Sequence, residues 1–113
     1  MSISTILNIA RSGLEASQVA IQTTSHNISN VDTPGYSTKD IDFQFEFMSL
    51  TQGASPNVID APGLVVNNDG NNVSMDREAR LLAENALRFN LASSLMKTQL
   101  KLINSAIQEG KSG

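Results

Sequence analysis

Apolar or small residues recur near both ends of the chain at alternating intervals of three and four. This rhythm is typical of long helices that pack along a narrow seam. From residue 3 to residue 31 the positions are Ile3, Leu7, Ala10, Leu14, Ser17, Ile21, Thr24, Ile28 and Val31. From residue 75 to residue 107 they are Met75, Ala79, Leu82, Ala86, Phe89, Ser93, Met96, Leu100, Ile103 and Ile107. We therefore predict a mainly α fold with two long antiparallel helices, over 1–31 and 74–110, in coiled-coil-like packing.

The C-terminal helix has start and stop signals as well as the rhythm. Ser74 is a suitable N-cap, because its hydroxyl can accept a hydrogen bond from the first turn. Asp76 and Glu78 follow in that turn, where carboxylates interact favourably with the helix dipole. Gly110 is expected to end the helix.

The N-terminal helix carries almost no charge, since Arg11 and Glu15 are the only charged residues between 3 and 31. An ordinary surface helix has charged residues on the face that meets water. Small uncharged residues, by contrast, can be surrounded by neighbours at a low desolvation cost. Two interpretations stay open: a weakly polar face in water, or a helix contacted on several sides.

The middle segment, residues 32–73, is rich in Asn, Asp, Gly, Ser and Pro, which favour turns and loops. Pro34–Gly35 suits the centre of a tight turn, because Pro fixes a negative φ and Gly accepts the positive φ that follows. A short strand is predicted where apolar residues alternate with polar ones, at Ile41, Phe43, Phe45 and Phe47.

A β-hairpin is predicted later in the same segment. Its turn would be Asp69–Gly70, and its strands would be residues 64–66 and the residues around Val73. Two short strands are marginally stable in water. We therefore expect the middle segment to become ordered beside a partner.

The composition excludes several classes of function. Aromatic residues make up 4% of the 113-residue chain, so part of its burial is expected to come from partners. The net charge of −3, with dispersed Lys and Arg, gives no basic patch for nucleic acid or an anionic membrane. No apolar run could span a bilayer and no secretory signal opens the chain, so we expect a soluble, unprocessed protein.

Few residues offer chemistry. Cys is absent, which excludes disulfides and thiolate sites. His26, the single histidine, lies near a predicted helix end, where a cap or surface role is expected. Asp40, Asp42 and Asp69 could hold a cation, but their spacing does not match a calcium loop. We predict no enzyme activity, no cofactor and no metal, with a metal-binding module kept as an alternative.

The residues around the end of the first helix carry a family motif. Residues 25–36, Ser-His-Asn-Ile-Ser-Asn-Val-Asp-Thr-Pro-Gly-Tyr, resemble the N-terminal motif of bacterial flagellar rod and hook proteins. Residues 39–43, 73–78 and 85–89 resemble the proximal rod family, FlgB, in particular. The motif and interface residues implied by the resemblance are Asn27, Asn30, Asp32, Thr33, Pro34, Gly35, Tyr36, Asp40, Asp42, Phe43, Met75, Asp76, Arg77, Glu78 and Asn85.

The paired asparagines of this motif, Asn27 and Asn30, also have a physical reading. Asn tolerates the left-handed conformation and caps backbone groups. Two of them just before a Pro-Gly turn can end a helix and fix the direction in which the chain leaves it. Whether they only stop the helix or also face a neighbouring subunit stays open.

The resemblance implies a structural subunit of the proximal rod of the flagellar basal body. Such a subunit is exported without a cleaved signal and joins a helical tube in the periplasm that transmits torque and surrounds the export channel. The implied partners are copies of itself, FliE, FlgC, FlgF, FlgG, the MS ring and the flagellar export apparatus. The alternatives are a FlgC-like rod subunit and a cytoplasmic helical-hairpin adaptor or export chaperone, although a free adaptor needs solvating charges on its first helix.

Overall fold

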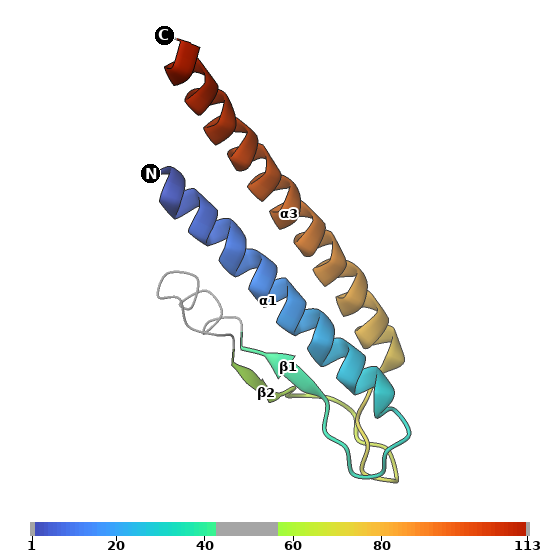
Figure 1. Cartoon of the computed structure of the whole chain (residues 1–113). Coiled ribbons are helices and arrows are strands. Elements are labelled where there is room, and N and C mark those ends of the chain that lie inside the picture. The colour runs from blue at the N-terminus through green and yellow to red at the C-terminus, as the bar shows by residue number, and fades with distance from the viewer. Residues whose placement is uncertain (1, 43–56, 113) are drawn as a thin grey trace.

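The computed structural model describes residues 2–42 and 57–112. Its elements are helix α1 (Ile3–Ser29), strand β1 (Lys39–Ile41), strand β2 (Val58–Asp60) and helix α3 (Met75–Ser112). The helices run antiparallel along a molecule 71 Å long, with the start of α1 and the end of α3 toward one pole and the loops at the other (Figure 1). We call these the tip pole and the loop pole. The predicted fold, two long packed helices with a small antiparallel strand pair, is confirmed.

Local chemistry sets both ends of α1. Ser2 is the N-cap, and its side-chain oxygen accepts a hydrogen bond from the Thr5 N–H at 3.1 Å. At the other end the N–H of Asn30 donates to the carbonyl oxygen of Asn27 at 3.1 Å, and the chain then enters the turn at Pro34. The helix ends two residues before the predicted boundary.

Small residues form the buried face of α1. The fully buried positions are Ala10, Ala16, Ser17, Thr24 and Asn27. Half-buried beside them are the predicted seam residues Leu7, Leu14, Ile21 and Ile28. A Cβ atom added at Gly13 would lie 3.7 Å from the Cβ of Ala92. The two helices therefore approach closely where both contribute small residues.

The face of α3 that meets α1 is rotated from the predicted seam. Its buried residues are Glu78 and Asn85, and Leu81 and Ala92 are half-buried. Met96 and Ile103 of the predicted seam are half-buried, but Leu82, Phe89, Leu100 and Ile107 keep 37%, 38%, 49% and 50% of their surface exposed. In the single chain, therefore, α1 does not fully cover the predicted seam, and the packing role of these residues stays a prediction. The polar contacts of Glu78 described below fix the rotation of the helix.

The two ends of α3 compare differently with the sequence prediction. Ser74 is the N-cap as predicted, because its hydroxyl oxygen accepts a hydrogen bond from the Arg77 N–H at 3.3 Å. Gly110 does not end the helix, which continues to Ser112. Gly110 does not adopt the positive φ of a helix stop, and a helical Gly costs only about 1 kcal/mol relative to Ala. Neither helix of the described residues is long and apolar enough to cross a membrane.

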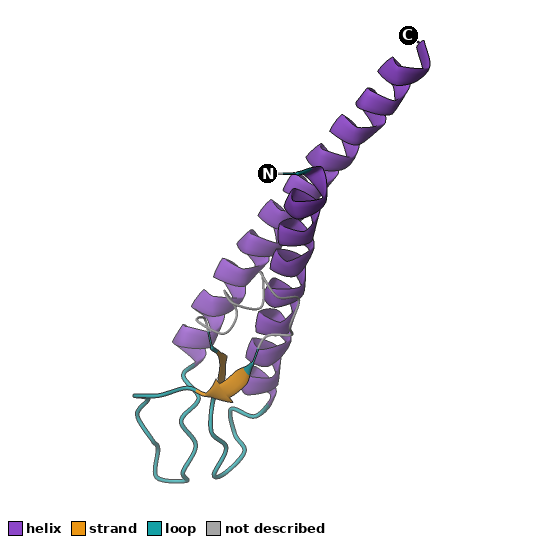
Figure 2. Ribbon diagram, turned by 90° about the vertical axis from the view of Figure 1, so that its left-hand side faces the viewer, coloured by secondary structure: helices purple, strands orange, loops and turns teal. Residues whose placement is uncertain are grey.

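The strand pair uses different residues from those predicted. β1 and β2 are antiparallel, with Lys39 opposite Asp60 and Ile41 opposite Val58. The alternating pattern predicted a strand that begins at Ile41, whereas Ile41 is the last residue of β1. The other residues of that pattern, Phe43, Phe45 and Phe47, lie outside the described residues. Figure 2 shows this pair beside the helices, with the loops below it.

The second predicted hairpin has a turn over residues 67–70, centred on Asn68–Asp69, one residue before the predicted Asp69–Gly70, and it lacks its strands. The Gly70 N–H donates to the carbonyl oxygen of Asn67 at 2.9 Å, and Gly70 has a φ of +83°. Residues 64–66 are not a strand, and Val65 is 85% exposed. The reason is that the backbone beyond the turn has other partners: the Val73 N–H donates to the side-chain oxygen of Asn71 at 2.8 Å.

Candidate functional site

Buried and half-buried polar residues gather at the loop pole, where the end of α1, β1 and the start of α3 meet. We call this cluster the polar junction, and it consists of Asn27, Tyr36, Thr38, Asp40, Asn71, Asn72, Arg77 and Glu78. Its residues come from three places that carry sequence motifs: the end of α1 with the turn after it, β1, and the start of α3. Buried polar groups are costly unless they are hydrogen-bonded, so the partners of each side chain decide what the cluster does.

Asn27 is the hub of the junction and is 1% exposed. Its amide nitrogen donates to the carbonyl oxygen of Lys39 at 2.8 Å and to Oε2 of Glu78 at 3.1 Å. Its amide oxygen accepts from the Lys39 N–H at 2.9 Å and from the Tyr36 hydroxyl at 2.8 Å. One side chain therefore holds the turn, β1 and α3 against the last turn of α1.

Glu78 brings a charge into this cluster, and its side chain is fully buried. Its Oε1 accepts from Nη1 of Arg77 at 2.7 Å. The second Arg77 nitrogen, Nη2, donates to Oδ2 of Asp40 at 2.8 Å. Arg77 thus bridges a carboxylate of α3 to one of β1, and Glu78 has both oxygens paired, as a buried carboxylate requires.

A second set of bonds ties the two loops together. The amide nitrogen of Asn71 donates to the carbonyl oxygens of Asn30 and Thr33, at 2.9 Å and 2.8 Å. The side-chain oxygen of Asn72 accepts from the N–H and the hydroxyl of Thr38, at 2.7 Å and 2.8 Å. Asn71 and Asn72 were missed in the sequence because a hairpin turn explained that run of asparagines. The signal available in the sequence was the pair of Asn residues directly after Gly70, because Asn side chains often bond to nearby backbone groups.

Two glycines allow the loops to touch. Gly35 has a φ of +73°, as its predicted turn requires, and the Tyr36 N–H closes that turn on the Thr33 carbonyl at 3.2 Å. The Gly35 N–H also donates to the carbonyl oxygen of Asp69 at 2.9 Å. A Cβ added at Gly70 would lie only 3.3 Å from the Cα of Gly35. The contact is therefore backbone against backbone.

The remaining N-terminal motif residues surround the junction. The Asn30 amide donates to the carbonyl oxygen of His26 at 2.9 Å, and its side-chain oxygen accepts from the Thr33 hydroxyl at 3.0 Å. The rings of His26 and Tyr36 lie 5.7 Å apart in a tilted arrangement. Asp32 and Pro34 are exposed on the loops.

The motif residues of the other segments divide into two groups. Arg77, Glu78 and Asp40 are in the junction, whereas Met75 and Asp76 are exposed at the start of α3. Asp42 is half-buried and Phe43 lies outside the described residues.

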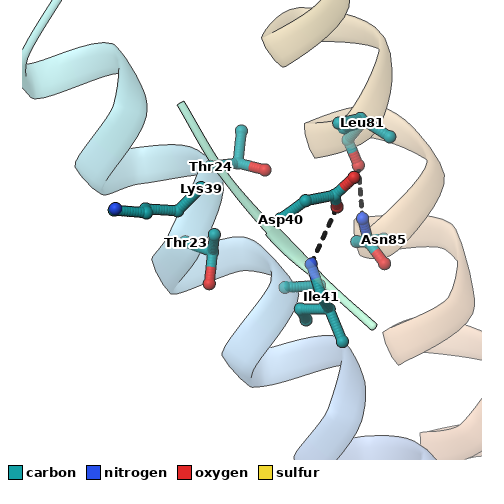
Figure 3. A pocket seen from close by; sticks show the side chains of 8 residues that line it. Thr23, Thr24, Lys39, Asp40, Ile41, Leu81 and Asn85 are labelled. Atoms are coloured by element: carbon teal, nitrogen blue, oxygen red, sulfur yellow. Dashed lines mark hydrogen bonds between the residues drawn. The ribbon is translucent and has the colours of Figure 1, made fainter. Parts of the chain in front are cut away.

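Asn85 lies seven residues, about two helical turns, beyond Glu78 on α3. It is buried, and its amide donates to the carbonyl oxygen of Leu81 at 2.8 Å. It lines a small, partly open cavity of about 10 Å³ between α1, β1 and α3, where the Ile41 N–H donates to Oδ1 of Asp40 at 2.8 Å (Figure 3). Such a volume is comparable to one water molecule.

One group of the junction, Tyr36, and one group beside it, Lys39, have displaced pKa values. Burial is the main cause that raises the pKa of the Tyr36 hydroxyl. The hydrogen bond to Asp60 is the main cause that raises the pKa of the exposed Lys39 ammonium. Both shifts favour the protonated form that makes the observed hydrogen bond.

The side chains of the junction hold separate parts of the chain together. Among residues 2–42 and 57–112, no group of three His, Asp or Glu side chains is placed to hold a metal ion. Of the three aspartates considered for a cation, Asp40 is paired with Arg77 and Asp69 lies in the outer loop, where its carboxylate accepts from the Asn71 N–H at 3.0 Å. The arrangement fixes the direction in which the chain leaves α1 and enters α3.

Comparison with known proteins decides the family. Residues 7–36 match the family model described as flagella basal body rod protein. The flagellar basal body rod protein FlgB of Salmonella typhimurium is 33% identical in an alignment that covers 74% of this chain and 79% of the relative. FlgB of Escherichia coli K12 is 32% identical with the same coverage, and FlgB of Yersinia ruckeri is 32% identical over 76% of this chain and 81% of the relative.

The chain is a flagellar basal body rod protein of the FlgB type. The matched segment of this rod protein runs from α1 through the Pro34–Gly35 turn to Tyr36. It therefore includes Asn27, the hub of the junction, while the Glu78 and Arg77 partners come from α3. The family segment and the distant C-terminal helix meet in one hydrogen-bonded cluster.

Proposed function

We propose that this rod protein forms part of the wall of a helical tube that transmits torque and surrounds the flagellar export channel. As a member of the family it is a structural subunit of the basal body rod. The observation that carries the proposal is the exposed apolar side of α3, formed by Leu82, Phe89, Leu100 and Ile107. A three-four seam turned outward is a surface for another helix.

The lengths of the helices support the same proposal. α3 has 38 residues and α1 has 27, so the last turns of α3 extend beyond α1 at the tip pole (Figure 2). In these turns Leu102 is 57% exposed and Ile107 is 50% exposed. A neighbouring subunit can cover them, and a contact between different surfaces, repeated along a screw axis, gives an open helical array.

The polar junction has a defined part in this proposal. A tube wall requires every copy to present its helices at the same angle. Asn27, Arg77 and Glu78 lock the relative positions of α1, β1 and α3 with bonds at fixed angles. The junction would therefore make the subunits uniform rather than contact a substrate, and no catalytic role is proposed for it.

The proposed partners and location follow from the family resemblance. The partners are further copies of the chain, the rod proteins FlgC, FlgF and FlgG, the junction protein FliE, the MS ring and the flagellar export apparatus. The subunit would be exported without a cleaved signal and would assemble in the periplasm. Its family places it in the flagellar basal body.

A charge on the exposed face of α3 tests the proposal. Leu100→Asp puts a carboxylate where a neighbouring helix would pack, at a position half exposed in the single chain. Val65→Asp is the matched control, because it makes the same kind of change on an exposed loop residue. Both variants are expressed in place of the chromosomal copy, and purified basal bodies are probed for the protein while swimming is scored in soft agar.

We expect Leu100→Asp to keep the helical circular dichroism of the wild type but to be absent from basal bodies. Val65→Asp should be incorporated and support swimming. If Leu100→Asp were incorporated as well as Val65→Asp, the exposed side of α3 would not be the assembly surface.

A further inference from the structure

A buried threonine hydroxyl beside the polar junction has no hydrogen-bond partner among the described residues. It belongs to Thr24, which lies on the face of α1 that meets α3 and is 3% exposed. The hydroxyl of the preceding residue, Thr23, donates to the carbonyl oxygen of Val19 at 2.8 Å, whereas the Thr24 hydroxyl makes no such bond in the part of the chain that the structure describes. A hydroxyl withdrawn from water is costly unless it is hydrogen-bonded, so Thr24 requires a partner.

Asn85 presents a second buried polar atom on the facing helix, α3. The residue is 7% exposed. Its amide nitrogen donates to the carbonyl oxygen of Leu81 at 2.8 Å, but its amide oxygen accepts no hydrogen bond from the described residues. An amide oxygen has two lone pairs, and a buried one is normally paired. The two helices thus each bring one unpaired polar atom to the same cavity.

The cavity that Thr24 and Asn85 line has room for one water molecule. Its volume is about 10 Å³, and Asp40 of β1 also lines it. A site for one water needs roughly 10–15 Å³, about one water-sized sphere, and two to four polar partners. In Figure 3 the Thr24 hydroxyl points from α1 toward the gap in which Asp40 and Asn85 lie. The volume meets the lower limit, and three polar side chains are available.

Asp40 has hydrogen-bonding capacity left for a water. Its Oδ1 accepts from the Ile41 N–H and its Oδ2 from Nη2 of Arg77, both at 2.8 Å. A carboxylate offers about four lone-pair sites, so these two bonds do not saturate it. Since Arg77 already ties Asp40 into the polar junction, a water bound to Asp40 would also connect Asn85 to the junction.

We propose that this cavity binds a single structural water, which bridges Thr24 of α1, Asp40 of β1 and Asn85 of α3. The water accepts from the Thr24 hydroxyl and donates one hydrogen to the Asn85 oxygen and the other to the Asp40 carboxylate. Three hydrogen bonds are typical of a buried water. Because Asn85 lies about two helical turns beyond Glu78, the water extends the fixed alignment of α1 and α3 by that length. This inference does not depend on the rod function.

A double-mutant cycle tests the bridge. Thr24→Val keeps the shape of the side chain and removes its hydroxyl, and Asn85→Leu removes the amide at similar volume. Thr24 and Asn85 make no hydrogen bond to each other, so a water between them is the link that the cycle detects. Thr23→Val with Asn85→Leu is the matched control, because the Thr23 hydroxyl is already bonded to Val19. The equilibrium constant for unfolding of the full chain is measured in urea by helical circular dichroism.

We expect Thr24→Val to increase the unfolding constant at least about five-fold, because a bonded hydroxyl is lost. Asn85→Leu should then increase the constant at least about three-fold less than it does in the wild type, since the water has already gone. The control cycle should be additive. A lower unfolding constant in Thr24→Val would show a hydroxyl buried without a partner, and equal additivity in both cycles would show a bond within α1. Either result would overturn the proposal.

A crystal structure of the wild-type chain at high resolution is the second measurement, and it remains valid if Asn85→Leu unfolds the protein. We expect an ordered water within hydrogen-bond distance of the Thr24 hydroxyl and the Asn85 amide oxygen. A Thr24 hydroxyl bonded to the Ala20 carbonyl, with no water between the helices at this level, would contradict the bridge.

Discussion

Replacing Asn27 by Ala tests whether the polar junction holds the helix pair together. The substitution deletes four hydrogen bonds, to the N–H and carbonyl of Lys39, to the Tyr36 hydroxyl and to the Glu78 carboxylate. A neutral hydrogen bond contributes roughly 1 kcal/mol, and one to a charged group about 1.5–3 kcal/mol. Allowing for water that enters the space, we expect Asn27→Ala to lower the free energy of unfolding by about 3–5 kcal/mol.

The assay is urea unfolding of the purified protein, followed by circular dichroism at the helix band. Small domains are marginally stable, so a loss of this size should leave Asn27→Ala partly unfolded even without urea. Asn30→Ala is the matched control, because among the described residues its side chain bonds to exposed partners, the carbonyl of His26 and the hydroxyl of Thr33. Water can replace those bonds, and we expect a loss of about 1 kcal/mol or less. Equal losses in the two variants would refute the role assigned to the junction.

Three further outcomes follow from the loops and caps. Gly70→Ala should destabilise the protein by about 1–2 kcal/mol, because the positive φ and the nearby Gly35 backbone both oppose a Cβ atom. Gly110→Ala lies in open space within α3 and should stabilise the protein slightly. Thermal unfolding of the two variants compares these effects. Ser74→Ala should cost about 1 kcal/mol in urea unfolding through loss of the α3 N-cap, and Ser74→Asp should restore most of it. The absorbance of Tyr36, the single Tyr, should titrate above pH 10.0, since burial raises the pKa of its hydroxyl. Because the unfolded phenol loses its proton first, the free energy of unfolding should fall as the pH rises past 10.0. A titration midpoint at or below pH 10.0 would contradict the buried hydrogen bond.

Periodicity, cap residues and turn chemistry were sufficient to predict much of the fold. The three-four spacing located both helices, and Ser74 located the start of α3. The Pro34–Gly35 turn was predictable because only a few residue types accept its dihedral angles. The end of α3 was not, because Gly110 tolerates a helical conformation and only its surroundings decide between a stop and a continuation.

The strand pairing could not be read in the same way. Val65 and Val66 have the composition of a strand, yet they are exposed, and β1 pairs with residues 58–60. Pairing depends on which backbone groups other partners have already engaged. The side-chain oxygens of Asn71 and Asn72 accept hydrogen bonds from the backbone N–H groups of Val73 and Thr38. Single-sequence propensity contains no information on such bonds.

The sequence by itself determined local features: where the helices begin, how the chain turns after α1, and which residues share one face of each helix. It did not determine which way each face points. The tertiary structure decided that direction. Asn27 and Glu78 are 51 positions apart, and their hydrogen bond exists only once the helices are antiparallel and in register. A buried carboxylate must find its partners, so this one contact turns the Glu78 side of α3 inward and leaves Leu100 and Ile107 outside.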